Sequence, residues 1–392
     1  MLSEVAIVCI AKNESKYIQE WIYYHLKIGI SKIIIYDNSE NNELQFLEQT
    51  WENKVIVYHY PKLGEIEKIK RHQTITYPGT QINAYDNYIL NYKKRNLMYK
   101  WVAFIDCDEF IQINNGMNIV QFLNSINFHE GVLNVNWIHY GSNGNDKYDN
   151  KPVIERFTKK EININTTWHK TICIIQDIQY WVIAGHTPST NKYYRNSMGV
   201  KLPQDLFSKP CIDKISIAHF AVKSKEEFQE KIDRGNNHIQ NFGKRGWDHF
   251  NTYDRNEIED LTLLNTLKSK KNTYNGLDTD SYLWDHPDLF QNGCISPSSL
   301  FWHWENHGKK EGRLTNLNFD YNNKIKLKIE YGTTNNKIDV SNKFKNINII
   351  PKGDINRYNI IEIDQCPHIV KSIFINGIEY NENKEINLTS LN

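Results

Sequence analysis

The chain has 392 residues, so its length predicts two or three domains. Hydrophobic residues make up 40% of it, charged residues 24% and aromatic residues 12%, values that are typical of a globular protein with a sizeable core. A net charge of +1 excludes the basic surplus of a general nucleic-acid binder.

The first third of the chain alternates short apolar runs with helical patterns. Runs that suit strands buried on both faces cover 4–11, 31–40, 54–60 and 101–106. Residues 12–29 carry apolar side chains at helical spacing, and a second helical pattern runs from 84 to 99. This alternation predicts an α/β domain with a mostly parallel sheet.

Polar side chains follow three of these predicted strands. They are Asn13 and Glu14 after the first strand, Asp37 after the second, and Asp106 and Asp108 after the fourth. Because ligands bind beyond the carboxyl ends of strands in open sheets, we expect these side chains to converge on one ligand site.

The stretch WVAFIDCDEF at 101–110 contains the most distinctive of these ends. Asp106 and Asp108 alternate along the chain, so on a straight strand both point to the same face. Two carboxylates at that spacing can hold Mg²⁺ or Mn²⁺ and bridge it to a nucleotide diphosphate. A D-x-D sequence by itself is more often a solvated turn. Here it ends a buried strand, where unpaired carboxylates are costly, and this favours the metal site.

Short strands are expected between 130 and 222. Ser224 and Glu227 then form a capping-box sequence, which predicts a helix from 224 to 235 that ends at Gly235. Residues 254–271 also have a helical pattern. Beyond them we expect a small aromatic helix-turn-helix at 282–314 and an antiparallel β segment from 320 onward.

Together, these stretches resemble a GT-A fold glycosyltransferase of families 2 and 92. The resembling segments are AKNESKYIQEWIYYHLKIGISKIIIYDNSE, QINAYDNYIL leading into KWVAFIDCDEF, WIHYGSNG, PVIERF and AHFAVKSKEEFQEKIDRG. The resemblance implies a Rossmann-like mixed α/β sheet flanked by helices. We therefore expect a GT-A domain at 1–268, a small helical module at 269–318 and a β-rich domain at 319–392.

The resemblance also implies roles for the polar strand ends. Asn13 and Glu14 would contact the nucleotide, and Asp37 the uracil or ribose. Gln81 matches a glutamine on the donor side. Three of these residues also have simpler interpretations: Glu14 as a partner of the helix dipole, Asp37 as part of a turn, and Gln81 as a helix cap.

The resemblance assigns the metal to three further residues. Asp106 would face the ribose or sugar and help to hold the metal, Asp108 would bind the metal, and His219 would supply another ligand. His219 could instead be a core histidine, and His186 is left out of the metal set. The implied cofactor is Mn²⁺, or else Mg²⁺.

An inverting transferase needs a carboxylate that accepts the proton of the acceptor hydroxyl. Glu155 in PVIERF is the preferred candidate, although it could simply pair with Arg156. Asp248 and Glu109 compete for this role. Trp137 and Tyr140 could stack on a sugar face or could belong to the core.

The expected activity is transfer of a hexose from a UDP-sugar to a glycan acceptor such as lipopolysaccharide, capsule or glycoprotein. The family resemblance favours galactose, with glucose and N-acetylhexosamines as alternatives. A sugar-nucleotide-binding or glycan-binding protein without turnover is the alternative function. A nucleotidyltransferase is disfavoured, because the VCIAKNESK stretch lacks the glycines that wrap a triphosphate.

The expected location is the cytoplasm. The six cysteines form no C-x-x-C pair, which fits a reducing compartment. No secretory signal is apparent, and no stretch approaches the roughly 20 apolar residues that span a membrane. Contact with a membrane surface through a lipid-linked acceptor remains open.

Overall fold

The computed structural model describes the chain in segments. They are 5–61, 69–71, 74–76, 81–95, 99–164, 166–183, 186–203, 209–235, 246–269 and 272–313, with six strands between 328 and 381. Two compact units divide the chain. The first is Met1–Lys270 with Phe290–Gly293, and the second is Lys271–Leu289 with Cys294–Asn392. The three expected domains stay predictions.

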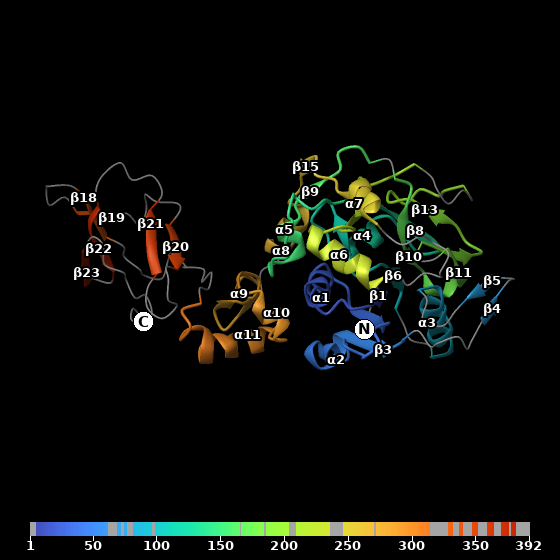
Figure 1. Ribbon diagram of the computed structural model, residues 1–392, viewed down its shortest axis with the longest axis horizontal. Helices are drawn as coiled ribbons and strands as arrows, with labels where there is room; N and C mark the ends of the chain where they lie inside the picture. Colours follow the sequence, from blue (N-terminus) through green and yellow to red (C-terminus); the bar gives the residue numbers. More distant parts are fainter. Residues whose placement is uncertain are drawn as a thin grey trace. The chain divides into compact units, whose positions relative to one another are not determined.

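Strands and helices alternate in the first half of unit 1 (Figure 1). They are β1 (Val5–Ala11), α1 (Ile18–Lys27), β2 (Lys32–Asp37), α2 (Phe46–Thr50), the 3-10 turn η1 (Glu52–Lys54), β3 (Val55–His59), β4 (Ile69–Arg71), β5 (Thr74–Thr76), α3 (Gln81–Arg95) and β6 (Trp101–Phe104). The buried apolar runs of the sequence therefore do form strands.

Short strands and helices follow in the second half of unit 1. They are β7 (Glu109–Ile113), α4 (Ile119–Ser125), β8 (Val132–His139), α5 (Val153–Arg156), β9 (Lys159–Lys160), β10 (His169–Cys173), the 3-10 turn η2 (Ile175–Asp177), β11 (Ile178–Ile183), β12 (Thr187–Thr190), β13 (Tyr194–Arg195), β14 (Ile215–His219), α6 (Lys225–Arg234), α7 (Trp247–Tyr253), β15 (Ile258–Glu259) and α8 (Thr262–Lys268).

One large mixed sheet organises unit 1. Its strand order is β3-β2-β1-β6-β10-β8-β14-β7, and β13 pairs with β8. Strands β3, β2, β1 and β6 run parallel, whereas β10 is antiparallel to both β6 and β8. β14 is parallel to β8 and antiparallel to β7. The sheet is thus parallel where the sequence alternates strands with helices, and mixed beyond β6.

Every residue of β1 is buried, so elements cover both faces of the sheet there. Ala6, Val8 and Ile10 on one face share a core cluster with Tyr85 and Tyr88 of α3. Helix α1 instead reaches β7, where the Trp21 indole and the Tyr24 hydroxyl donate hydrogen bonds to the carbonyls of Glu109 and Ile111. These hydrogen bonds tie the acidic segment after β6 to the first helix.

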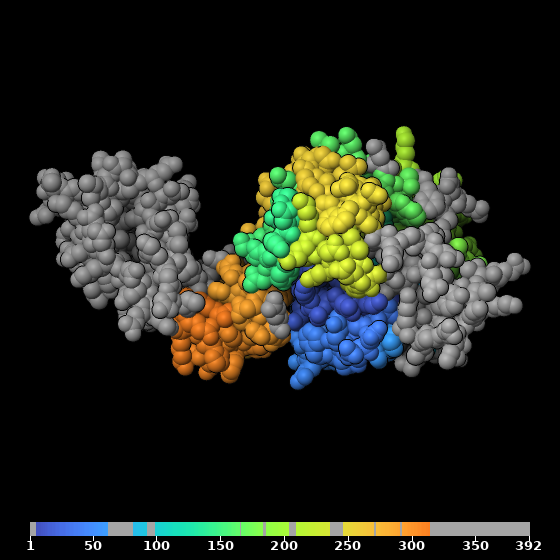
Figure 2. Space-filling model, viewed as in Figure 1, coloured from blue at the N-terminus to red at the C-terminus, as the bar shows by residue number. Residues whose placement is uncertain are grey.

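Helix α6 begins as the sequence predicts. The Ser224 side chain accepts a hydrogen bond from the Glu227 amide, the Glu227 carboxylate accepts one from the Ser224 amide, and Gly235 ends the helix at φ +73°. Figures 1 and 2 show α6, in yellow-green, against the blue N-terminal segments. The ion pair between Lys16 and Glu230 joins the two regions, which are far apart in the sequence.

The predicted helix at 254–271 is only partly correct, since helix covers Thr262–Lys268 alone. Ile258 and Glu259 form β15, which pairs with Lys160 and Lys159. Helix α7 at Trp247–Tyr253 was not predicted. Long-range pairing with β9 therefore overrides the local helical pattern at the start of the segment.

Unit 2 begins with short elements and continues as separate strands. Its elements are β16 (Thr273–Tyr274), β17 (Leu277–Asp278), α9 (Thr279–Asp285), α11 (Pro297–His303), the π-helical turn η3 (Trp304–Gly308), β18 (Lys328–Tyr331), β19 (Lys337–Asp339), β20 (Ile347–Pro351), β21 (Asn359–Ile363), β22 (Val370–Ile375) and β23 (Ile378–Asn381). Helix α10 (Asp288–Gln291) spans the division between the units. The later strands pair antiparallel in the orders β19-β18-β22-β23 and β20-β21.

Candidate functional site

Two basic or amide side chains hold Asp106 beyond the end of β6. Its Oδ1 accepts a hydrogen bond from Gln81 Nε2 at 2.6 Å, and its Oδ2 lies 2.9 Å from Lys170 Nζ. Lys170 lies on β10, and its Nζ is also 3.7 Å from Glu109 Oε2. Burial lowers the pKa of Lys170, but Asp106 and Glu109 outweigh this effect and raise it. Lys170 is therefore a buried cation between two carboxylates.

Asp108 faces two other side chains. Its Oδ2 lies 2.6 Å from Lys231 Nζ on α6, and its Oδ1 lies 3.9 Å from His219 Nε2 at the end of β14. Burial would raise the pKa of Asp108, yet Lys231 and His219 hold it well below its usual range. Burial keeps the pKa of His219 well below 6.5, so the ring is neutral, which is the form that binds metals.

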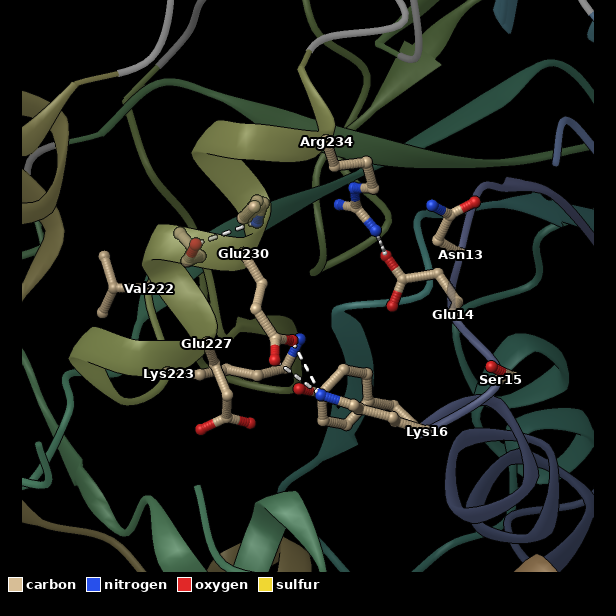
Figure 3. A pocket seen from close by; sticks show the side chains of 12 residues that line it. Asn13, Glu14, Ser15, Lys16, Val222, Lys223, Glu227, Glu230 and Arg234 are labelled. Atoms are coloured by element: carbon tan, nitrogen blue, oxygen red, sulfur yellow. Dashed lines mark hydrogen bonds and ion pairs between the residues drawn. The ribbon is translucent and has the colours of Figure 1, made fainter. Parts of the chain in front are cut away.

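A pocket of about 260 Å³ lies next to Asp108, between the loop that follows β1 and helix α6. Figure 3 shows Arg234 pointing at Glu14 and Lys16 reaching Glu230 across this pocket. The Arg234–Glu14 distance is 2.6 Å, and Arg234 also donates to the Lys12 carbonyl. Lys231, the partner of Asp108, also lines the pocket. The pocket and the acidic end of β6 therefore form one continuous site.

Two residues that line the pocket have left-handed backbones without being glycine. Asn13 has φ +53° and Lys223 has φ +56°. Such conformations cost free energy and gather at functional sites. Lys223 is 7% exposed, and its ammonium lies 4.1 Å from the centre of the Tyr17 ring. Four basic side chains and three glutamates line the pocket: Lys16, Lys223, Lys231, Arg234, Glu14, Glu227 and Glu230.

The structure brings several of the predicted donor residues together. Asn13 and Glu14 line the pocket, and Gln81 contacts Asp106. Asp37 is fully buried, and its carboxylate accepts hydrogen bonds from the amides of Ser39 at 2.9 Å and Leu44 at 3.0 Å. These bonds close the turn after β2, and the uracil or ribose role of Asp37 stays a prediction.

The candidate bases lie in different environments. Glu155 is an exposed residue of α5, while its neighbour Arg156 turns inward and pairs with Glu227. Asp248 is exposed on α7, and Glu109 is fully buried, where its Oε2 accepts the Asp106 amide. Glu155 therefore stays a prediction.

The metal prediction can be tested against the donor set of the site. Over the described parts of the chain, no group of three or more His, Cys, Asp or Glu side chains could hold a metal ion. Both oxygens of Asp106 already have protein partners. Asp108 and His219 remain as a pair, and their 3.9 Å separation suits two ligands that are each about 2.1 Å from one ion. Among the described residues, Asp108 and His219 are thus the two ligands that this site offers.

Three basic residues of this site did not stand out in the sequence. They are Lys170, Lys231 and Arg234. Lys231 and Arg234 lie four and seven residues after Glu227, so all three share one face of α6. That spacing was a usable signal. Lys170 gave none, because its partners lie 64 and 61 positions away in the chain.

The chain matches the family model described as glycosyltransferase family 92 over residues 5–252, which is more than half of its length. A glycosyltransferase family 92 protein of Ricinus communis is 26% identical over 117 residues, which are 30% of this chain and 18% of that protein. One of Oryza sativa subsp. japonica is 23% identical over 159 residues, covering 39% of this chain and 24% of that protein. The chain thus aligns with less than a quarter of either relative.

Among solved structures, the crystal structure of a mycobacterial protein covers 34% of this chain and 41% of its own, at 12% identity and a TM-score of 0.23. This likeness is too low to support an argument about the fold. No helix in the described segments is both long enough and apolar enough to cross a membrane.

Proposed function

The chain belongs to glycosyltransferase family 92, and we propose that it transfers a hexose from a UDP-sugar to a glycan acceptor. The family match carries this proposal, because the matched residues 5–252 contain the whole site around Asp106, Asp108 and the pocket. Galactose is the favoured sugar, followed by glucose and N-acetylhexosamines, and a GT-A fold is the expected architecture.

The basic side chains of the pocket suit the diphosphate of the donor. Lys231 and Arg234 reach it from α6, and Lys223 from the segment before that helix. Lysine and arginine both bind phosphate oxygens through charge-assisted hydrogen bonds. The nucleotide of the donor would lie against Asn13, Glu14 and Asp37 at the ends of β1 and β2. The donor sugar would lie near Gln81 and Asp106.

The Asp108–His219 pair fits Mn²⁺ or Mg²⁺ if oxygens of the donor diphosphate complete the ligand set. A divalent cation there would neutralise negative charge on the UDP leaving group. Asp106, which the sequence suggested as a second carboxylate ligand, is better suited to hold Lys170 and a donor hydroxyl. The Asp108–Lys231 pair must open before Asp108 Oδ2 can serve as a ligand.

An inverting course requires a base on the acceptor side, and Glu155 remains the proposed residue. Glu155 is exposed on α5. Its carboxylate therefore meets the acceptor hydroxyl only if the acceptor binds beside it or the chain moves. Glu155→Gln should then keep UDP binding and slow transfer by about 100-fold, the usual contribution of a general base.

The decisive experiment measures UDP release from a panel of UDP-sugars with Mn²⁺ and then with EDTA. If UDP is released from one UDP-sugar and EDTA abolishes this release, the result would support both the donor and the need for a metal ion. Asp108→Asn should abolish release while the circular dichroism spectrum stays unchanged. UDP binding without release from any sugar, even with added acceptor glycans, would support the alternative of a binding protein without turnover. Absence of UDP binding would overturn the proposal.

A further inference from the structure

Five aromatic rings gather around the ends of β8, β10 and β14. We name them the ring cluster: Trp137, His139, Trp168, His186 and His219. The Trp137 ring centre lies 4.4 Å from that of His219 and 5.2 Å from that of His186, which in turn is 4.7 Å from Trp168. His139 and His219 are partners in adjacent strands, and their ring centres are 5.6 Å apart.

The ring cluster differs from the aromatic core of unit 1, because part of it faces solvent. Trp168 is 39% exposed, and Trp137 and His186 are half-buried. The two indoles lie 6.1 Å apart with 28° between their planes. Tyr140, which the sequence placed beside Trp137 as a possible stacking residue, is only 1% exposed and belongs to the core. Trp168 is therefore the most exposed ring of the cluster.

Three polar atoms of the ring cluster are buried without a hydrogen-bond partner among the described residues. They are Nε1 of Trp137, which is a donor, Nε2 of His139 and Nδ1 of His219. His139 Nδ1 lies 2.9 Å from Glu161 Oε1. A carboxylate fixes the proton on Nδ1, so Nε2 of a neutral ring is an acceptor. Buried polar groups without partners call for an explanation, and the hydroxyls of a ligand could supply the missing partners.

The ring cluster adjoins the reacting end of the proposed donor site. The Lys170 ammonium, which pairs with Asp106, lies 5.9 Å from the centre of the Trp137 ring. His219, which faces Asp108, belongs to the cluster itself. In the sheet, β10, β8 and β14 lie on the opposite side of β6 from β1 and β2. The nucleotide-side residues and the ring cluster therefore flank the acidic end of β6.

We propose that the ring cluster binds the acceptor and takes a neutral pyranose of a glycan. The inference rests on the proposed transferase function. Indole faces suit the apolar C–H face of a pyranose, and a donor and an acceptor atom beside them suit its hydroxyls. We infer a neutral pyranose because Lys170, the nearby cation, already pairs with Asp106 and Glu109. An acidic sugar would find no free positive charge among the described ring-cluster contacts.

The test measures binding of methyl β-galactoside, methyl β-glucoside and glucuronate to the full chain by saturation-transfer NMR, with UDP present. Trp168→Ala should weaken binding of a neutral glycoside by about tenfold, which corresponds to roughly 1.4 kcal/mol. Trp137→Phe, which keeps the ring and removes the N–H donor, should weaken it too. Trp302→Ala is the matched control, because Trp302 is also an exposed tryptophan beside a histidine, at 58% exposure and 5.3 Å from the His307 ring.

Two further measurements distinguish failure of this inference from failure of the proposed function. They are the affinity for UDP and the affinity for an unreactive UDP-sugar analogue. Both affinities should be unchanged in Trp168→Ala. Weaker analogue binding with normal UDP binding would overturn the inference, because the rings would then hold the donor sugar. Tighter binding of glucuronate than of the neutral glycosides would overturn it as well, as would wild-type glycoside affinity in Trp168→Ala. A wild-type chain that binds glycosides but no UDP would contradict the proposed function and leave the sugar site standing.

Discussion

Lys231 Nζ lies 2.6 Å from Asp108 Oδ2, so helix α6 brings an ammonium group to the acidic end of β6. Both side chains are largely buried, and Lys231 also donates a hydrogen bond to the Ala221 carbonyl. Asp108 is therefore already neutralised by the protein. Any divalent cation at this position has to compete with Lys231 for the carboxylate, and Lys231 becomes available to a phosphate once the cation has replaced it.

This competition predicts opposite effects of Lys231→Met on two ligands. Without nucleotide, Mn²⁺ should bind about tenfold more tightly, since one competing charge interaction is gone. UDP should bind less tightly when Mn²⁺ is saturating, because a phosphate contact is lost. Titration of Mn²⁺ by electron paramagnetic resonance, with and without UDP, measures both. Lys16→Met is the control, since Lys16 lines the same pocket but pairs with Glu230. Unchanged Mn²⁺ affinity in Lys231→Met would refute the competition.

The buried pair of Arg156 and Glu227 predicts a large loss of stability when it is broken. The two N–O distances are 2.8 and 2.9 Å, and both side chains are at most 5% exposed. Burial would raise the pKa of Glu227, but Arg156 lowers it to about 2. Glu227→Gln leaves the Arg156 charge buried and unpaired, so it should lower the free energy of unfolding by about 3 kcal/mol or more.

Glu230→Gln on the same helix is the matched control for Glu227→Gln. Glu230 pairs with Lys16 at 2.7 Å, but the two side chains are 52% and 44% exposed. Exposed pairs contribute about 0–1 kcal/mol, so this variant should unfold at nearly the wild-type denaturant concentration. Equal losses in the two variants would show that burial does not set the strength of these pairs.

The sequence predicted one contact of Glu227 and missed the other, and the reason is distance along the chain. The capping box of Ser224 and Glu227 lies within four consecutive residues, so local spacing reveals it. The partner of Glu227 is Arg156, which lies 71 positions earlier and has no local signal. Lys170 was missed for the same reason. The parallel strands were predictable because burial on both faces leaves a continuous apolar run, whereas the pairing of β15 with β9 depends on tertiary contacts.

His25 predicts a specific pH dependence of stability. Its Nδ1 contacts the Trp21 carbonyl at 2.8 Å, and its Nε2 accepts the Ile111 amide at 3.3 Å. Burial lowers the pKa of His25 to about 3, against 6.5 for an ordinary histidine. As the pH falls below 6.5, the unfolded chain therefore binds a proton at His25 that the folded chain does not bind. The contribution of the neutral His25 to the free energy of unfolding is complete above pH 6.5 and is lost as the pH falls toward 3.

The non-titrating variant His25→Gln tests this dependence. Between pH 6.5 and about 4.5, the free energy of unfolding should fall by about 2–3 kcal/mol more in the wild type than in the variant, because of this one proton. Urea unfolding of both proteins at several pH values measures the difference, and other buried histidines contribute equally to the two curves. Parallel curves would mean that His25 takes up its proton at the same pH in the folded and the unfolded chain.

Phe290 predicts the behaviour of a chain that is cut after residue 270. Although it follows a segment of unit 2, it belongs to unit 1, where its ring lies 5.6 Å from Tyr23 and its carbonyl accepts a hydrogen bond from Gln19. Phe290 is only 6% exposed. The fragment 1–270 should fold and bind UDP, because the large sheet and its helices lie within it. It should nevertheless lose roughly 3–5 kcal/mol, the usual cost of deleting a buried phenylalanine side chain.

The full chain with Phe290→Ala is the companion to this fragment. If Phe290 accounts for the lost stability, the midpoint of unfolding of unit 1 should shift by a similar urea concentration in the variant and in the fragment. Unfolding of unit 1 is the transition at which UDP binding is lost. Fluorescence and UDP binding, followed through the same urea titration, assign that transition to unit 1. A fragment as stable as the full chain would show that Phe290 contributes nothing to unit 1. A fragment that does not fold, beside a folded Phe290→Ala chain, would place the domain boundary beyond residue 270.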